Sequence, residues 1–302
     1  MASLDALVSG GYNVVAVVTM ADKPAGRGHK MITSPVKDYA VAHNIPLLQP
    51  EKLKDEAFVE QLRSCRADLQ IVVAFRMLPE VVWAMPRLGT FNLHGSLLPQ
   101  YRGAAPINWA IINGDKETGV TTFFLKQEID TGNIILQRRT PVGDNEIFGE
   151  VYDRLMKIGA ELVTETTDLI LAGDVPVTVQ DNIPLDQLRP APKIFKDTCR
   201  IDFGKTANDI HNFVRGLAPV PCAWTDLLIN GNLYEGCKIF AVKPVVSVGA
   251  DNHEPADGGV PVAEISKHSL RIKCADGCVE VLEMQLPGKK RMAVCDLVNG
   301  LR

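Results

Sequence analysis

Three polar side chains in this sequence could together carry out chemistry on a carbonyl group. Asn92 and His94 stand two residues apart in an apolar stretch, and Asp130 follows later, directly before a Thr-Gly pair. An asparagine amide can donate a hydrogen bond to an oxyanion, and a histidine can donate a hydrogen bond or move a proton near neutral pH. A carboxylate can orient the imidazole and favour its charged form. The three residues therefore form a candidate site for the attack of an amine on a carbonyl.

The spacing alone leaves simpler interpretations open for each of these residues. A histidine near the end of a strand is often an ordinary hydrogen-bonded residue, and Asp130 before Thr131 could be a turn residue. Residues two apart on a strand project from the same face. Asn92 and His94 therefore need a strand that ends at His94 if they are to reach one ligand.

The elements that would position this site follow an alternating strand and helix pattern in the first half of the chain. Three apolar runs, at 12–19, 69–75 and 89–94, are typical of strands buried on both faces of a parallel sheet. We expect a further short strand at 46–48 and helices at 37–43, 55–65 and 147–172. This order predicts an α/β domain with an open, mostly parallel sheet. Ligands bind beyond the carboxyl ends of the strands in such sheets, which is where His94 would lie.

The second half has a different pattern. Four prolines between 176 and 192 predict a linker. Alternating strands at 270–274 and 279–283 flank an Asp-Gly turn, which is a strong hairpin signal. Further short strands are expected at 227–229, 238–242 and 260–265, and a helix at 206–217. The predicted organisation is a catalytic domain at 1–175, a proline-rich linker at 176–195 and a small β-barrel domain at 196–302.

Composition narrows the class of protein. The net charge of −4 divides into 18 Lys+Arg against 23 Asp+Glu in residues 1–189, which gives −5, and 14 against 13 in residues 190–302, which gives +1. This is not the pattern of a general nucleic-acid binder. The seven cysteines are scattered and predict reduced thiols, with no metal site. No apolar run approaches the ~18–20 residues of a membrane span, and no secretory signal is visible, so we expect a cytoplasmic protein.

A set of short motifs gives this chemistry a context. The run from His94 to Gly103 reads His-Gly-Ser-Leu-Leu-Pro-Gln-Tyr-Arg-Gly, and Ala-Pro-Ile (105–107), Gly-Asp (114–115), Thr-Gly-Val-Thr (118–121) and Asp-Thr-Gly (130–132) follow. This set resembles the signature of the 10-formyltetrahydrofolate-dependent formyltransferases, over essentially the whole chain. Within that family it is most similar to members whose acceptor is the α-amine of methionyl-initiator tRNA.

The resemblance implies a specific fold and site. It implies a Rossmann-like first domain, an OB-like barrel, and a monomer that makes formyl-methionyl-tRNA for translation initiation. Asn92, His94 and Asp130 match the catalytic residues of the family, and Ser96, Leu97, Leu98 and Pro99 match its tetrahydrofolate-binding loop. The donor would be 10-formyltetrahydrofolate, with no metal.

Two basic segments are candidates for contact with tRNA. A glycine-containing loop, 22–30, matches a family loop that engages the acceptor arm, so Arg27 and Lys30 are expected near phosphates or base edges. Lys289, Lys290 and Arg291 in the barrel are suited to the tRNA backbone. From composition alone, both segments could equally be solvated surface.

One departure from the family leaves other functions open. Members have an additional strand and a Gly-Thr-Pro-x-Phe turn ahead of the segment that begins at Ala2, and this sequence has neither. That strand would lie inside the sheet, so we expect unpaired strand edges beside its place. The alternatives are formyl transfer to a small amine, hydrolysis of the formyl donor, or a folate- or RNA-binding protein without catalysis.

Overall fold

The computed structural model describes residues 1–25, 30–180, 184–246 and 259–300, which form two compact units. The first unit contains Met1–Arg102, Gly119–Arg139 and Arg154–Arg189, and the second contains Gly103–Thr118, Thr140–Asp153 and Pro190–Arg302. Neither unit is one continuous segment of chain. The last change of unit falls between Arg189 and Pro190, within the segment that the sequence predicts as a linker.

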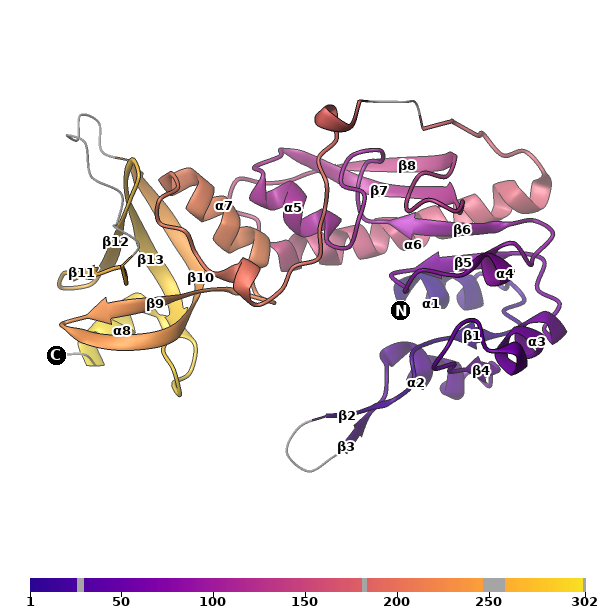
Figure 1. Cartoon of the computed structure of the whole chain (residues 1–302), viewed down its shortest axis with the longest axis horizontal. Coiled ribbons are helices and arrows are strands. Elements are labelled where there is room, and N and C mark those ends of the chain that lie inside the picture. Colours follow the sequence, from indigo (N-terminus) through magenta and orange to yellow (C-terminus); the bar gives the residue numbers. More distant parts are fainter. Residues whose placement is uncertain (26–29, 181–183, 247–258, 301–302) are drawn as a thin grey trace. The chain divides into compact units, whose positions relative to one another are not determined.

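The first unit is built on two small sheets (Figure 1). In one sheet β1 (Val17–Val18) pairs in parallel with β4 (Leu47–Leu48). In the other, β5 (Gln70–Val73) pairs in parallel with β6 (Thr90–His94), and β6 pairs antiparallel with β7 (Glu117–Phe124), which is followed by β8 (Ile134–Pro141). The predicted α/β class, with parallel pairing at the strand that carries Asn92 and His94, is confirmed.

Two predicted strands are less extensive and less buried than expected. Only Val17–Val18 of the segment 12–19 is in a strand, because β4 is its one neighbour in the described chain and offers two residues. Among the described residues the strand β5 pairs with β6 alone, and Val73 at the end of β5 is 41% exposed. The prediction that these strands are buried on both faces is therefore wrong. Within the described parts of the chain, β1 and β5 each have one neighbouring strand, in agreement with the unpaired edges expected from the sequence.

Helices cover these sheets and begin at recognisable caps. The Ser34 and Asp55 side chains accept hydrogen bonds from the backbone of the first turns of α2 (Pro35–Ala42) and α3 (Glu56–Ser64). The long helix α6 (Phe148–Ala172) lies along β6 in Figure 1 and places Val163 and Ile170 against Phe91. The remaining elements of this unit are α1 (Ala2–Ser9), β2 (Lys23–Ala25), β3 (Lys30–Ile32), α4 (Glu80–Trp83) and the 3₁₀ helix η1 (Leu185–Gln187).

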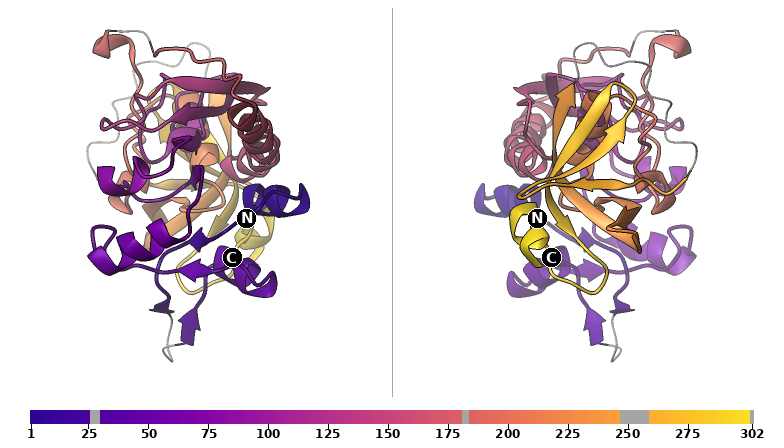
Figure 2. Two further views of the ribbon diagram at one scale, coloured as in Figure 1. Left: turned by 90° about the vertical axis from the view of Figure 1, so that its right-hand side faces the viewer. Right: turned by 90° about the vertical axis from the view of Figure 1, so that its left-hand side faces the viewer.

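The second unit contains a curled antiparallel sheet, which faces the viewer in the right-hand view of Figure 2. Its strands are β9 (Ala223–Ile229), β10 (Asn232–Val246), β11 (Ala263–Ile265), β12 (Leu270–Cys274), β13 (Gly277–Gln285) and β14 (Met292–Ala293). They follow the order β11-β12-β13-β10-β9, with β14 beside β13. The end strands meet at a bridge between Leu228 and Val262, so the sheet curls into the predicted barrel.

Helices close the core of this barrel. Ile210, Val214 and Leu217 of α7 (Ala207–Leu217) are almost completely buried in it, as their spacing along the helix predicts. On its other side α7 packs on α5 (Pro106–Ile112), and the Asn108 amide donates a hydrogen bond of 2.8 Å to the Gly216 carbonyl. The remaining helices are η2 (Asp197–Cys199) and α8 (Val294–Gly300). In the part of the chain that the structure describes, no helix is both long and apolar enough to cross a membrane.

Candidate active site

Strand β6 has one apolar and one polar face. Phe91 and Leu93 pack in the cluster that α6 contributes to, and Phe91 is completely buried there. Because side chains alternate along a strand, Asn92 and His94 project from the other face. His94 stands opposite Thr121 of β7 in the register. The predicted same-face pair is therefore present at the carboxyl end of β6.

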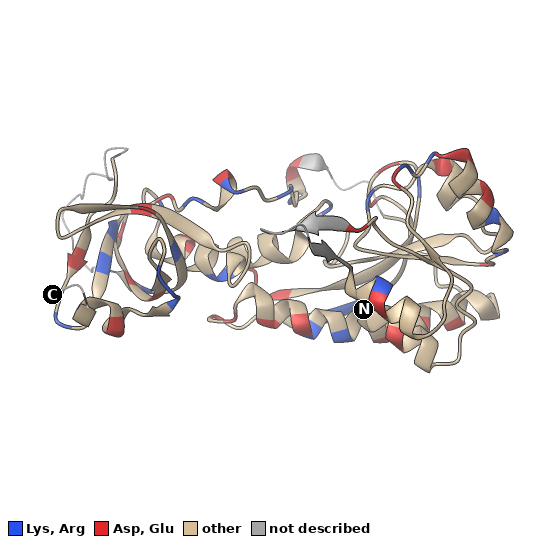
Figure 3. Cartoon of the chain, turned by 90° about the horizontal axis from the view of Figure 1, so that it is seen from below, with Lys and Arg blue, Asp and Glu red and all other residues tan. Residues whose placement is uncertain are grey.

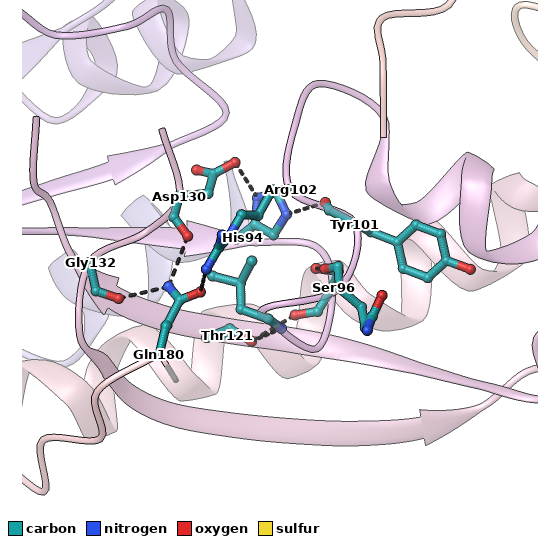
Figure 4. Close-up of polar contacts among 10 residues, drawn as sticks. His94, Ser96, Tyr101, Arg102, Thr121, Asp130, Gly132 and Gln180 are labelled. Carbon is teal, nitrogen blue, oxygen red and sulfur yellow. Dashed lines mark hydrogen bonds and ion pairs between the residues drawn. The ribbon is translucent and has the colours of Figure 1, made fainter. Parts of the chain in front are cut away.

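The His94 ring is held on both of its nitrogens (Figure 4). Nε2 lies 2.8 Å from the carbonyl oxygen of Tyr101, and Nδ1 lies 3.8 Å from a carboxylate oxygen of Asp130. A carbonyl oxygen can only accept, so Nε2 must carry a proton. The ring is 7% exposed and its edge meets Phe123, with 6.5 Å between the ring centres. Nδ1 is consequently the ring nitrogen that faces the Asp130 carboxylate.

Asp130 is presented by a tight turn between β7 and β8. Its backbone has a φ of 55°, in the left-handed region that few residues with a side chain adopt. Gly132, two residues later in the turn, lies so close to β7 that a Cβ there would be 1.5 Å from the Phe124 carbonyl oxygen. Only glycine fits at this close approach. The Asp-Thr-Gly motif therefore serves the geometry of the turn and brings the carboxylate to His94.

The residue that holds this turn lies in the segment predicted as a linker. The Gln180 side-chain amide donates to the carbonyls of Asp130 and Gly132, at 2.8 and 2.7 Å, and accepts from Arg102 at 2.6 Å (Figure 4). Sequence reasoning missed Gln180. The alternation of Val175, Val177 and Val179 before it is the signal that could have indicated a strand-like segment in this place.

Two buried side-chain atoms of the described chain have no hydrogen-bond partner, Asn92 Oδ1 and Arg102 Nε. A buried polar atom left in this state costs about 1–3 kcal/mol, so native proteins keep few of them. One atom is an acceptor on the face of β6 that carries His94, and the other belongs to the side chain that holds Gln180. Unsatisfied polar atoms in such a place fit a polar substrate that supplies the missing partners.

The loop after β6 is fixed by a buried hydroxyl. Thr121 Oγ1 donates to the Ser96 carbonyl at 2.7 Å and accepts from the Leu98 backbone and from the Gln137 side chain. The Ser96 side chain is completely buried and Leu98 is 3% exposed. Leu97 and Pro99 are partly exposed. Of the four residues predicted to bind tetrahydrofolate, two therefore shape the loop from inside and two can face a ligand with their side chains.

A second loop reaches the same edge of the sheet and was not predicted from the sequence. The register of β5 and β6 ends where Val73 stands opposite Leu93, one residue before His94, and this loop begins with Ala74. Ala74 also has a positive φ, 48°. Val73 and Met77 are 41% and 68% exposed, so this loop presents apolar side chains at the carboxyl ends of the strands. Such surface suits the flat ring of an organic ligand.

The hairpin β2–β3 lies in the segment for which the sequence predicts the tRNA contacts of the first unit. Arg27 lies outside the described residues, and Lys30 begins β3. The base of the hairpin is fixed at Asp22, whose carboxylate pairs with Lys37 and accepts from Gln49 at 3.0 Å. Lys37 and then Gln49 hold the pKa of Asp22 below its usual range. The hairpin is therefore tied at its base to α2 and to the segment after β4.

The three predicted cations of the second unit differ in their surroundings. Lys289 and Lys290 are exposed after β13. Arg291 makes a two-pronged ion pair with Glu283, with both distances 2.6 Å, and stacks 4.2 Å over the Phe240 ring. Figure 3 shows Lys and Arg interspersed with Asp and Glu along the chain. Positive charge is accordingly confined to short segments of the chain, in agreement with the charge counts of its two parts.

The described residues contain no group of three or more His, Cys, Asp or Glu side chains that could hold a metal ion. Burial raises the pKa of the Cys222 and Cys237 thiols to about 11, so these two stay protonated and behave as apolar core residues.

Comparison with known proteins identifies the family. The family model described as formyl transferase matches residues 1–167, and the formyl transferase C-terminal domain matches residues 193–302. The chain belongs to the formyltransferase family. It is 56% identical over 299 residues to the methionyl-tRNA formyltransferase of Bacteroides fragilis, covering 99% of this chain and 90% of that protein. The enzyme of the same name from Porphyromonas gingivalis is 50% identical, with 99% and 91% covered.

Solved structures share the fold of this family. WlaRD, a sugar 3N-formyltransferase studied with dTDP and 5-N-formyl-THF, aligns with a TM-score of 0.63 and 21% identity, covering 96% of this chain and 94% of that one. HypX from Aquifex aeolicus, in complex with tetrahydrofolic acid, aligns with a TM-score of 0.58 and 19% identity, covering 86% of this chain and 43% of that one. The predicted fold and family are confirmed.

Proposed function

We propose that this protein transfers the formyl group of 10-formyltetrahydrofolate to the α-amine of methionyl-initiator tRNA, which gives formyl-methionyl-tRNA. The observation that carries the proposal is the His94–Asp130 pair at the carboxyl end of β6, with Asn92 on the same face of the strand. The near full-length similarity to relatives with that name supports the acceptor.

Each residue has a distinct task in this reaction. The amine nitrogen attacks the formyl carbon, a new C–N bond forms, and negative charge gathers on the formyl oxygen. The Asn92 amide can donate to this oxygen, and one well-placed donor is worth about 2.7–4 kcal/mol in turnover. The proton that the amine loses passes through His94 Nδ1 and Asp130 to the departing folate nitrogen, whose bond to the formyl carbon breaks.

The donor would be held by the two loops at the same strand ends. Leu97 and Pro99 can contact it with their side chains, while Ser96 and Leu98 fix the loop from inside. Val73 and Met77 offer apolar surface for its ring system.

The acceptor would be held by local basic segments. Lys30, which begins β3, and Arg27, which lies outside the described residues, are the proposed contacts of the first unit. Lys289, Lys290 and Arg291 are the proposed contacts of the second unit, with Arg291 already oriented by Glu283. Phosphate contacts of this kind position a nucleic acid and weaken as salt is added. We place the reaction in the cytoplasm and expect a monomer.

The test is to incubate the protein with 10-formyltetrahydrofolate and charged initiator tRNA and to measure formyl-methionyl-tRNA. Parallel reactions contain an amino sugar nucleotide, glycinamide ribonucleotide or no acceptor. Formylation of the tRNA alone supports the proposal. Formylation of a small amine, or release of formate without an acceptor, would establish one of the alternative activities, and folate binding without any product would indicate a non-catalytic protein.

A further inference from the structure

In Figure 4 the Gln180 side chain connects the Asp130 turn to Arg102, because it hydrogen-bonds to both. Asp130 lies 50 residues before Gln180 in the chain, and Arg102 lies 78 residues before it. Gln180 itself touches neither ring nitrogen of His94. Its contact with the site runs through the backbone of the turn.

The direction of these hydrogen bonds is fixed by their chemistry. The Arg102 guanidinium can only donate, so the Gln180 oxygen must face it, and the Asp130 and Gly132 carbonyls can only accept, so the Gln180 NH₂ must face them. All three bonds measure 2.6–2.8 Å. A glutamine satisfies this arrangement in one orientation alone. A carboxylate in the same place could accept from Arg102 but would repel both carbonyls.

The backbone that carries Gln180 is itself anchored. Thr178 and Ile134, at the start of β8, exchange two backbone hydrogen bonds of 2.8 and 2.9 Å. Ile134 stands two residues after Gly132, and Thr178 stands two residues before Gln180. One short segment therefore holds the Asp130 turn at two points. Thr178 pairs with the backbone at the start of β8, and the Gln180 amide binds the carbonyls of the turn.

This anchoring matters because the turn decides where the Asp130 carboxylate lies. The carboxylate meets His94 Nδ1 at 3.8 Å from a backbone with positive φ, a conformation that the surroundings must impose. A displacement of about 1 Å in a reacting group can cost about a hundredfold in rate. The two carbonyls that Gln180 binds flank the residue between them and so resist rotation of the turn.

We propose that Gln180 is a positioning residue, which sets the distance between the Asp130 carboxylate and His94 Nδ1 by holding the Asp130 and Gly132 carbonyls. This inference deepens the proposed function and rests on it for its kinetic consequences. Its structural consequence, the placement of Asp130 against His94, is independent of the acceptor.

Two variants test the proposal, with a matched control. Gln180→Glu keeps the size of the side chain and removes both donors, and Gln180→Met removes all polar contacts. We expect each to lower kcat about 10–100-fold, with KM for the tRNA changed less than about threefold. Gln61→Glu, on the exposed surface of α3, is the control for the same chemical change and should retain wild-type kcat. Wild-type kcat in both Gln180 variants would overturn the proposal.

A double-variant cycle separates positioning from a general structural effect. If Gln180 acts through Asp130, then Gln180→Glu should lower kcat less than twofold further in an Asp130→Asn background. The same fold loss in both backgrounds would show that Gln180 acts elsewhere.

A spectroscopic measurement needs no substrate and so distinguishes failure of this inference from failure of the proposed function. In protein labelled with ¹⁵N-histidine, the signals of His94 among the six histidines are assigned by comparison with His94→Ala. Gln180→Glu should shift the Nδ1 signal and leave the Nε2 signal, which reports the bond to Tyr101, in place. An unchanged Nδ1 signal would contradict the proposal even in an active enzyme.

Discussion

The His94 Nε2–H group donates a hydrogen bond to the carbonyl oxygen of Tyr101, 2.8 Å away, and this leaves Nδ1 to face Asp130. The tautomer of the imidazole is thus set by the backbone at the end of the loop that follows β6. Tyr101 has a φ of 60°, so this carbonyl is aimed by an uncommon backbone conformation.

Replacing His94 by alanine should lower kcat for formyl transfer about 10²–10⁴-fold, the usual contribution of a proton-transferring side chain. Binding of the tRNA, measured by filter retention, should change less than twofold. His43→Ala is the control, since His43 stacks on Tyr39 in an exposed position. Equal loss of activity in both variants would remove His94 from the mechanism.

Replacing Thr121 by valine should destabilise the protein by about 1–3 kcal/mol, because the buried Leu98 N–H loses its acceptor. It should also raise KM for the folate donor several-fold, since the loop from Ser96 to Pro99 is released. Thr122→Val is the matched control, because Thr122 bonds Thr166 on the opposite face of β7. The control should lose stability in chemical denaturation but keep its KM for folate; a similar rise in KM would argue against the loop assignment.

Replacing Asp22 by asparagine should raise KM for the tRNA several-fold at unchanged KM for folate, because the base of the hairpin β2–β3 loses its ion pair with Lys37. Asp68→Asn removes an exposed ion pair with Arg87 and should leave both constants unchanged. If Asp22→Asn instead changed KM for folate, the hairpin would be assigned to binding of the formyl donor.

The tyrosine that ties the N-terminal segment to α6 predicts a loss of stability at high pH. The hydrogen bond to Asp168, together with burial, raises the pKa of Tyr12 to about 12, from the 10.0 expected in the unfolded chain. The protonated phenol is favoured by folding, so its contribution is complete below pH 10 and disappears as the pH rises through 12. Thermal unfolding should show wild type and Tyr12→Phe converging between pH 10 and 12. A constant difference over that range would contradict the assignment.

Local patterns predicted the parts of the site that depend on neighbouring residues. Asn92 and His94 alternate with the apolar Phe91 and Leu93, so the strand and the polar face could both be read directly. Asp130 could be assigned through its Asp-Thr-Gly motif and the family resemblance. Its contact with His94 joins a turn to the end of β6, and the motif contains the glycine that the close approach to β7 requires.

The contacts that the sequence did not reveal are distant in the chain. Gln180 follows a proline and precedes a second one, a composition typical of linkers, and its partners lie 48–78 residues earlier. No periodicity within the segment reports such a partner. The predicted length of the strand at 12–19 was wrong for a similar reason, because the length of a strand depends on the strand that pairs with it.

The packing of α7 on α5 has a consequence for how this family can exchange its domains. The Gly216 carbonyl is met by Asn108, and a Cβ at Gly216 would lie 2.7 Å from the Ile112 side chain. The helix α5, which supports α7 of the barrel, is thus encoded ahead of β7, far from the rest of the barrel sequence. Recombination at a single point near Pro190 would replace α7 together with the barrel but would keep the original α5. A new barrel can therefore be acquired intact only if its α7 still matches α5 at this contact.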